Sequence, residues 1–212
     1  MKRAIVFING DLKGKKDFYL RYIQKEDEIF CADGGAEHAY DLGLMPKLIL
    51  GDFDSVSKEV LNYYKHKEVK LKSYPSEKDK TDSQILLEFL IEHNFEKVII
   101  FAGLGGNLDH ILGNLYLLEK FSEFDIDLSF VSPSETIEII TKQKTIKNRQ
   151  NKRVSLLPLT SKVTGIDLTG FKYELTDGKM VKGDTLGLGN LITKKEAVIK
   201  LKSGKLFMII CT

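Results

Sequence analysis

The sequence predicts a two-domain protein, with an N-terminal α/β domain built on a mainly parallel sheet and a C-terminal all-β domain. Up to about residue 132, short apolar segments alternate with amphipathic ones, and the connections between them are short. This alternation is typical of a parallel sheet with helices on both faces. After Ser132-Pro133-Ser134 only short alternating segments separated by turn residues remain. We therefore expect domains at residues 1–132 and 133–212.

The N-terminal pattern predicts a Rossmann-like order of strands and helices. Strands are expected at residues 3–8, 28–32, 47–50, 69–72, 97–101 and 126–131, and helices at 36–42, from 57, at 81–93 and at 108–120. Residues 47–50 are wholly apolar apart from Lys47, which indicates a buried parallel strand. Residues 81–93 give the clearest helix, because Ile85, Leu86, Phe89 and Leu90 share one face.

The C-terminal segments predict a β-sandwich or partial barrel. Alternating stretches occur at residues 136–140, 154–157, 163–168 and 189–193. Residues 197–201 and 206–211 flank Ser203-Gly204, which predicts a terminal hairpin. About 80 residues is small for an independent domain, so we expect this domain to pack on the first one or on a second subunit.

Composition excludes several classes of protein. Among 212 residues the net charge is +2, which gives no basic field for nucleic acid. The longest apolar runs are far shorter than a membrane span. The only cysteines, Cys31 and Cys211, have neither metal-site spacing nor the density of a disulfide scaffold. These features predict a cytoplasmic protein without a membrane or nucleic-acid partner.

The stretch Gly51-Asp52-Phe53-Asp54-Ser55 follows the strand at residues 47–50. In extended backbone, residues two apart point to the same side, so Asp52 and Asp54 are expected to converge. Converging carboxylates repel unless a cation lies between them, and Mg²⁺ suits such oxygen ligands. The simpler interpretation makes Asp52 a turn residue and Asp54 a helix cap, and Ser55 is a second candidate cap for the helix that follows.

Other polar clusters follow other predicted strands or precede the clearest helix. Ligands of parallel sheets bind beyond the carboxyl ends of the strands, so these clusters are expected to meet at one rim. The acidic residues involved are Asp33, Asp52, Asp54, Asp79 and Asp82. With Gly34, Gly35, Lys78 and Lys80, they indicate a metal–phosphate site. The chain has no Gly-x4-Gly-Lys-Ser/Thr motif, which excludes a P-loop.

The segment Gly105-Gly106-Asn107-Leu108-Asp109-His110 opens the helix predicted at residues 108–120. On a helix His110 and Asn114 share a face. Taken alone, Asp109 is also explained as a first-turn acid and His110 as a surface residue.

The motifs described above make the chain resemble the thiamine pyrophosphokinase family. The resembling segments are residues 31–36, 51–55, 78–82 and 105–110 with Asn114, and the similarity continues through residues 170–175 and 187–190. The resemblance implies that ATP binds in the α/β domain and thiamine in the β domain. It also implies a homodimer with active sites shared between subunits.

The resemblance assigns roles to individual residues. It implies that Asp52, Asp54, Asp79 and Asp82 form the catalytic centre and that Asp52, Asp54 and Asp82 hold Mg²⁺. The ATP contacts that it implies are Asp33, Gly34, Ser55, Lys78, Thr81, Gly106, Asn107, Asp109 and His110. The thiamine contacts are Tyr173 and Asn190, although Tyr173 also fits an ordinary aromatic of a sheet core.

The chain departs from the family pattern at three positions. Asn107 stands where the family has Arg, Gly189 where it has Ser, and Leu191 where it has an acidic residue. The reaction implied is transfer of the diphosphoryl unit of ATP to thiamine, with release of AMP. Two alternatives remain: a pyrophosphokinase or nucleotidyltransferase acting on another small alcohol, and a non-catalytic regulator that binds nucleotide or thiamine.

Overall fold

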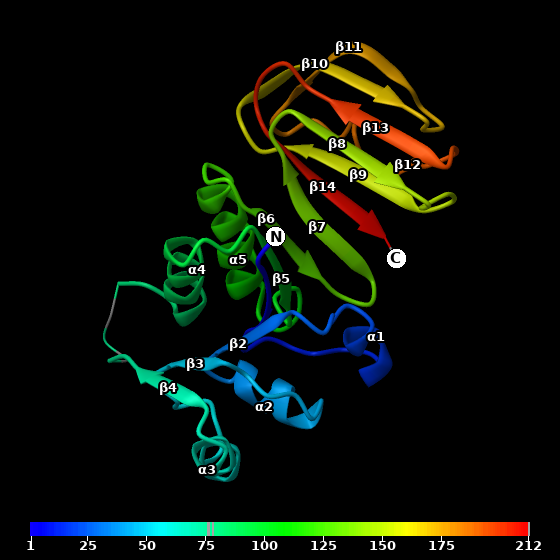
Figure 1. Cartoon of the computed structure of the whole chain (residues 1–212). Coiled ribbons are helices and arrows are strands. Elements are labelled where there is room, and N and C mark those ends of the chain that lie inside the picture. The colour runs from blue at the N-terminus through cyan, green and yellow to red at the C-terminus, as the bar shows by residue number, and fades with distance from the viewer. Residues whose placement is uncertain (76, 78, 212) are drawn as a thin grey trace. The chain divides into compact units, whose positions relative to one another are not determined.

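The structure is a computed structural model that describes residues 1–75, 77 and 79–211 (Figure 1). The candidate ATP contact Lys78 lies outside the described residues. The chain divides into two compact units, Met1–Pro133 and Ser134–Thr212. Within the described residues, no helix is long and apolar enough to cross a membrane.

The N-terminal unit contains a parallel sheet, as the alternating pattern predicted. Its strands follow the order β6-β5-β1-β2-β3-β4, and each neighbouring pair is parallel. The strands are β1 (Arg3–Phe7), β2 (Glu28–Ala32), β3 (Leu48–Gly51), β4 (Lys70–Ser73), β5 (Lys97–Phe101) and β6 (Asp127–Val131). Because β1 pairs with both β2 and β5, the order of strands reverses beside β1, which is where such sheets bind ligands.

Helices cover both faces of this sheet. They are α1 (Lys16–Leu20), α2 (Gly35–Asp41), α3 (Lys58–His66), α4 (Asp82–Glu92) and α5 (Leu108–Phe121). One core cluster joins Phe7 of β1 to Tyr19 of α1, Ala39 of α2 and Tyr64 of α3. Alternate strand residues face the opposite side of the sheet. On that side Phe30 of β2 lies near Phe89 of α4, with ring centroids 6.2 Å apart.

Side-chain caps fix where two of these helices begin. The Thr81 hydroxyl accepts a hydrogen bond from the N–H of Gln84 at 3.2 Å and caps α4. Ser57 caps α3 by accepting from the N–H of Val60 at 3.3 Å. The expectation that Ser55 caps α3 was wrong, because the helix begins two residues later than that cap requires.

The C-terminal unit is all-β, as expected. One sheet has the order β12-β9-β14-β7 and the other β11-β10-β13-β8, with antiparallel pairing in both. The strands are β7 (Glu135–Ile140), β8 (Gln143–Lys147), β9 (Arg153–Pro158), β10 (Lys162–Thr169), β11 (Leu175–Val181), β12 (Asn190–Leu191), β13 (Glu196–Lys200) and β14 (Leu206–Cys211). Both sheets contribute to one core cluster, which includes Val154, Ile166, Ile199 and Met208.

The predicted terminal hairpin is wrong. Strand β13 pairs with β8 and β10, whereas β14 pairs with β7 and β9 in the other sheet. The turn signal at Ser203-Gly204 instead marks where the chain crosses between sheets, and Gly204 has a φ of 89°. Both strands still bury alternate residues, because each sheet turns one face to the shared core.

Candidate active site

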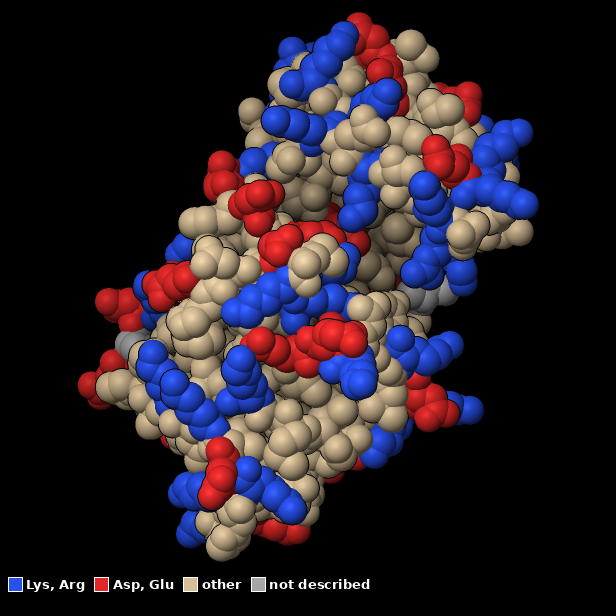
Figure 2. Space-filling model, viewed as in Figure 1, with Lys and Arg blue, Asp and Glu red and all other residues tan. Residues whose placement is uncertain are grey.

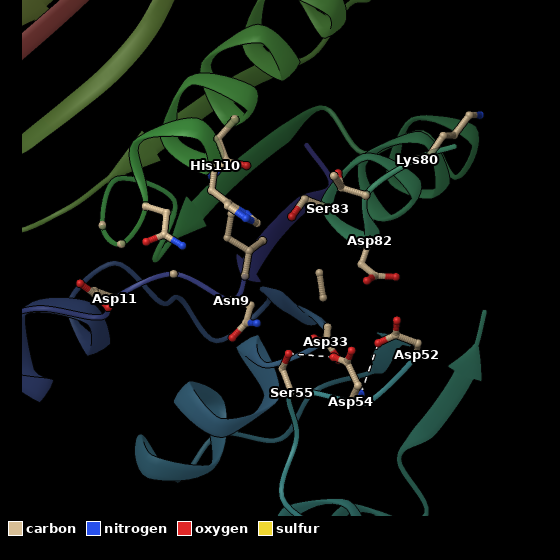
Figure 3. Close-up of a pocket in the computed structure, with 18 of the residues that line it drawn as sticks. Asn9, Asp11, Asp33, Asp52, Asp54, Ser55, Lys80, Asp82, Ser83 and His110 are labelled. Atoms are coloured by element: carbon tan, nitrogen blue, oxygen red, sulfur yellow. Dashed lines mark hydrogen bonds between the residues drawn. The ribbon is translucent and has the colours of Figure 1, made fainter. Parts of the chain in front are cut away.

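A pocket opens where strands β1, β2, β3 and β5 end and helices α4 and α5 begin (Figure 3). Its acidic lining residues are Asp11, Asp33, Asp52, Asp54, Asp79 and Asp82. The five carboxylates that the sequence predicted at one rim are therefore brought together. They meet because the carboxyl ends of parallel strands lie at the same edge of the sheet.

The backbone around the pocket is held in uncommon conformations. Asp33, Phe53 and Ala102 follow β2, β3 and β5, and their φ angles are 45°, 66° and 61°. Positive φ is costly for residues other than glycine and is concentrated at functional sites. Gly51 allows the close approach of Asp33: a Cβ at position 51 would lie 2.9 Å from that of Asp33.

Three carboxylates converge in this pocket. Asp33, Asp52 and Asp82 each place one oxygen within 4.8 Å of the other two. Asp82 reaches them from the first turn of α4, and Figure 3 shows it pointing toward Asp52. The Oδ1 atom of Asp33 is buried and makes no hydrogen bond within the part of the chain that the structure describes.

Burial is the largest influence on the pKa of Asp33 and raises it. Hydrogen bonds from Ser55 and Gly34 lower this pKa, the charges of Asp52 and Asp54 raise it again, and the net shift is upward. Ionised Asp33 is therefore destabilised in the absence of a cation. A hard divalent cation with oxygen ligands would relieve this repulsion, so the three residues fit Mg²⁺.

Asp54 lies in the same pocket but outside this group of three. Its carboxylate accepts a hydrogen bond from the Ser55 hydroxyl at 2.9 Å, and its N–H donates to Asp52 Oδ1 at 3.3 Å. The two aspartates do not follow the two-residue rule of extended chain, because Phe53 between them is left-handed. A direct metal contact by Asp54 stays a prediction, as does the catalytic role of Asp79.

The structure divides the other predicted ATP contacts. Those that line the pocket are Asp33, Ser55, Thr81, Gly106, Asn107 and His110, whereas Gly34 and Asp109 are not among the lining residues. Gly34 packs under Asn9, and a Cβ at position 34 would overlap the side-chain amide of Asn9. The carboxylate of Asp109 accepts from the N–H of His110 at 2.9 Å, as a first-turn acid does.

Sequence reasoning missed several lining residues, including Asn9, Asp11 and Ser83. The strand-end rule that identified Asp33 and Asp52 applies equally to Asn9 and Asp11, which follow β1. His38 places Nε2 2.7 Å from the carbonyl oxygen of Gly10 and supports the loop after β1. Asn114 donates to the carbonyl of Gly103 at 3.0 Å and supports the glycine-rich loop after β5.

In the C-terminal unit, Tyr173 and Asn190 form one small assembly. Tyr173 is 63% exposed, so it is not a core aromatic, whereas Asn190 is only 7% exposed. The amide of Asn190 donates to the Tyr173 carbonyl at 2.8 Å and accepts from the Tyr173 N–H at 3.1 Å. Asn190 therefore fixes the backbone that presents Tyr173.

The neighbouring Gly189 has a φ of 72°. Serine, which the family resemblance led us to expect here, adopts such a left-handed conformation only at a cost, whereas glycine adopts it freely. The left-handed backbone at position 189 therefore favours the glycine that is found there.

Comparisons with known proteins agree on one family for both units. The family model described as "Thiamin pyrophosphokinase, catalytic domain" matches residues 19–130, and "Thiamin pyrophosphokinase, vitamin B1 binding domain" matches residues 136–206. The chain is 30% identical to the thiamine pyrophosphokinase of Bacillus subtilis over 179 residues, which cover 84% of each chain. The chain belongs to the thiamine pyrophosphokinase family.

Solved structures named as thiamine pyrophosphokinases have the same fold. The crystal structure from Bacillus subtilis matches with a TM-score of 0.89 at 25% identity, covering 100% of this chain and 99% of that one. The structure from Geobacillus thermodenitrificans matches with a TM-score of 0.86 at 27% identity, covering 100% and 98%. Within the family match, the catalytic-domain segment contains Asp33, Asp52 and Asp82, and the B1-binding segment contains Tyr173 and Asn190.

Proposed function

We propose that this protein is a diphosphotransferase that moves the β,γ-diphosphoryl unit of ATP to the hydroxyl group of thiamine, giving thiamine diphosphate and AMP. The convergence of Asp33, Asp52 and Asp82 in the pocket carries the proposal. A triphosphate needs its charge neutralised at such a site, and three carboxylates are suited to hold the cation that does so. Membership of the family supplies thiamine and ATP as substrates.

Asp33, Asp52 and Asp82 would hold Mg²⁺, which when bound neutralises charge on the triphosphate. The chain's own residues then have to place the alcohol in line with the β-phosphorus. The alcohol oxygen bonds to that phosphorus, the bond from it to the oxygen shared with the α-phosphate breaks, and AMP leaves. A carboxylate of the rim accepts the hydroxyl proton or orients the hydroxyl group. Asp54 and Asp79 line the pocket and are the candidates for this role.

The proposal extends to the thiamine contact and the assembly. The exposed ring of Tyr173 offers a face for stacking on thiamine, and Asn190 holds the backbone that carries this ring. We propose a cytoplasmic homodimer in which each active site is shared between subunits. For the finer fold, the reversal of strand order beside β1 supports a Rossmann-like N-terminal domain, and the common core of two sheets supports a β-sandwich.

The test is to incubate the protein with ATP, Mg²⁺ and thiamine and to identify both products by mass. We expect equal amounts of AMP and thiamine diphosphate. Release of pyrophosphate would indicate nucleotidyl transfer instead. Binding of ATP or thiamine without turnover would indicate a regulator, and turnover only with another alcohol would indicate a different pyrophosphokinase.

A further inference from the structure

Lys80 is unusual among the residues of the pocket. Of the described lining residues it is the one lysine or arginine, whereas six of them are aspartates. Its ammonium group nevertheless does not point at the centre of the pocket: Nζ lies 2.8 Å from Oε2 of Glu88, and Figure 3 shows the side chain directed away from the convergent carboxylates.

Glu88 lies on α4 and has two further partners besides Lys80. Side chains on a helix lean toward its N-terminus, so Glu88 reaches back toward Lys80, which precedes the helix. Its other oxygen, Oε1, accepts from Gln84 Nε2 at 3.0 Å and lies 3.6 Å from Lys120 Nζ. Burial raises the pKa of Glu88, but Gln84, Lys80 and Lys120 outweigh it, and the pKa lies below its ordinary value.

The ion pair between Lys80 and Glu88 is weak enough for Lys80 to leave Glu88 for a phosphate group. The Lys80 side chain is 49% exposed and that of Glu88 is 28% exposed. Solvent therefore screens their attraction, and the pair is weak. Phosphate oxygens of a nucleotide in the adjoining pocket carry more charge than one carboxylate and compete for the same ammonium. Glu88 keeps Lys120 and Gln84 as partners when Lys80 leaves.

We propose that Glu88 is a positioning residue that competes with bound nucleotide for Lys80. In the free protein Glu88 holds the Lys80 ammonium outside the acidic centre. When ATP binds, Lys80 turns to a phosphate oxygen, which provides a cation in a pocket where Asn107 supplies none. This inference rests on the proposed function, because it requires ATP in that pocket.

The experiment measures Mg²⁺–ATP binding by titration calorimetry, together with kcat and KM, in Glu88→Gln. Glutamine keeps the shape and the contact with Gln84 but loses the charge that retains Lys80. We expect the Kd and the KM for ATP to fall by about two- to five-fold, the range of a weak surface pair, with the change in KM rather than in kcat. Glu92→Gln removes the same charge one turn further along α4, whereas the ion pair of Lys80 is made with Glu88. It is the matched control and should change neither.

A double variant separates this mechanism from a general effect of charge. In the Lys80→Met background, Glu88→Gln should leave ATP affinity unchanged, because the residue it releases is gone. An equal gain in both backgrounds, no gain in either, or weaker binding in Glu88→Gln would overturn the proposal. Failure of the unaltered protein to bind ATP would instead overturn the proposed function, so the two failures are distinguishable.

Discussion

Asp33, Asp52 and Asp82 repel one another, and the burial of Asp33 makes this repulsion costly to the folded protein. Replacing Asp52 with Asn should therefore leave the Tm without metal unchanged or raise it by about 1–3 °C. The same substitution should abolish most of the rise in Tm that Mg²⁺ produces, since binding of a ligand to the native state stabilises it. Thermal unfolding with and without Mg²⁺ measures both effects.

Asp11→Asn is the control for this substitution, because Asp11 lines the pocket outside the group of three. It should retain the response to Mg²⁺. If Asp52→Asn responds to Mg²⁺ as the unaltered protein does, Asp52 is not a ligand. A much lower Tm of the variant without metal would instead contradict the repulsion among the three carboxylates.

Truncation of Tyr173 should have little effect on the stability of the fold, whereas truncation of Asn190 should lower it, because Tyr173 is exposed and Asn190 is buried. Tyr173→Ala should change the free energy of unfolding by about 0.5 kcal/mol or less. The same substitution should raise the KM for thiamine. Asn190→Ala leaves the N–H and C=O of Tyr173 without their partner. This loss should cost about 1–3 kcal/mol.

Urea denaturation and steady-state kinetics on both variants check this expectation. A large loss of stability in Tyr173→Ala with an unchanged KM for thiamine would make Tyr173 a structural residue.

At this scale the sequence predicted which residues gather but not how each side chain is used. The five rim carboxylates were predictable, because their positions at strand ends follow from the parallel sheet. The place of Asp33 in the metal group was not, because it depends on the turn after β2 and on the closeness of Gly51. The hydrogen bonding of the Asn190 side chain to the Tyr173 backbone could not be predicted either, since the two residues are 17 apart in the sequence.

Among the elements, α2 is fixed to β1 by a backbone contact that only glycine permits. A Cβ at Gly35 would overlap the carbonyl group of Phe7. Gly35→Ala should therefore push α2 off the sheet and cost about 3 kcal/mol or more. In α5, a Cβ built at Gly113 would meet no atom of the described residues within 4 Å, apart from its chain neighbours and the nearby backbone of its own helix. Gly113→Ala should therefore stabilise the protein, by about 0.5–1 kcal/mol from helix propensity.

If this packing is correct, urea denaturation shows a lower free energy of unfolding for Gly35→Ala and a higher one for Gly113→Ala than for the unaltered protein. A loss at position 113 as large as that at position 35 would show that the contact between Gly35 and Phe7 is not what distinguishes them.

The type of most elements could be predicted, and their partners less well. Helix α4 was predicted to within a residue at each end, because its cap and its apolar face agree. The pairing of β13 and β14 was not, because a turn signal does not distinguish a hairpin from a crossing between sheets that share a core. Period-two burial is the same in both arrangements.

Across the whole molecule, charge is distributed unevenly between the two units. Lysine and arginine outnumber aspartate and glutamate in residues 134–212, and the reverse holds in residues 1–133. Figure 2 shows several basic side chains exposed on one face of the molecule. Opposite net charges favour contact between an N-terminal and a C-terminal unit, whether the two belong to one chain or to different chains. The shared active site therefore stays a prediction.

Mixed dimers test this arrangement. Asp82→Asn and Tyr173→Ala chains are co-expressed with different tags, so that some dimers contain one of each. With two-fold symmetry and shared sites, one site of a mixed dimer carries both substitutions and the other carries neither. Random pairing should restore roughly a quarter of the activity of the unaltered protein. Folded, doubly tagged dimers with only the summed activity of the parents would place each site within one chain.

The most direct test of the central claim is the rate and stoichiometry of product formation from ATP and thiamine at limiting Mg²⁺, compared between the unaltered protein and Asp52→Asn. We predict one AMP for each thiamine diphosphate in the unaltered protein, and a rate at least about 10²-fold lower in the variant, because the metal stabilises charge in the transition state. ADP with thiamine monophosphate as products, or a variant as fast as the unaltered protein, would contradict the account.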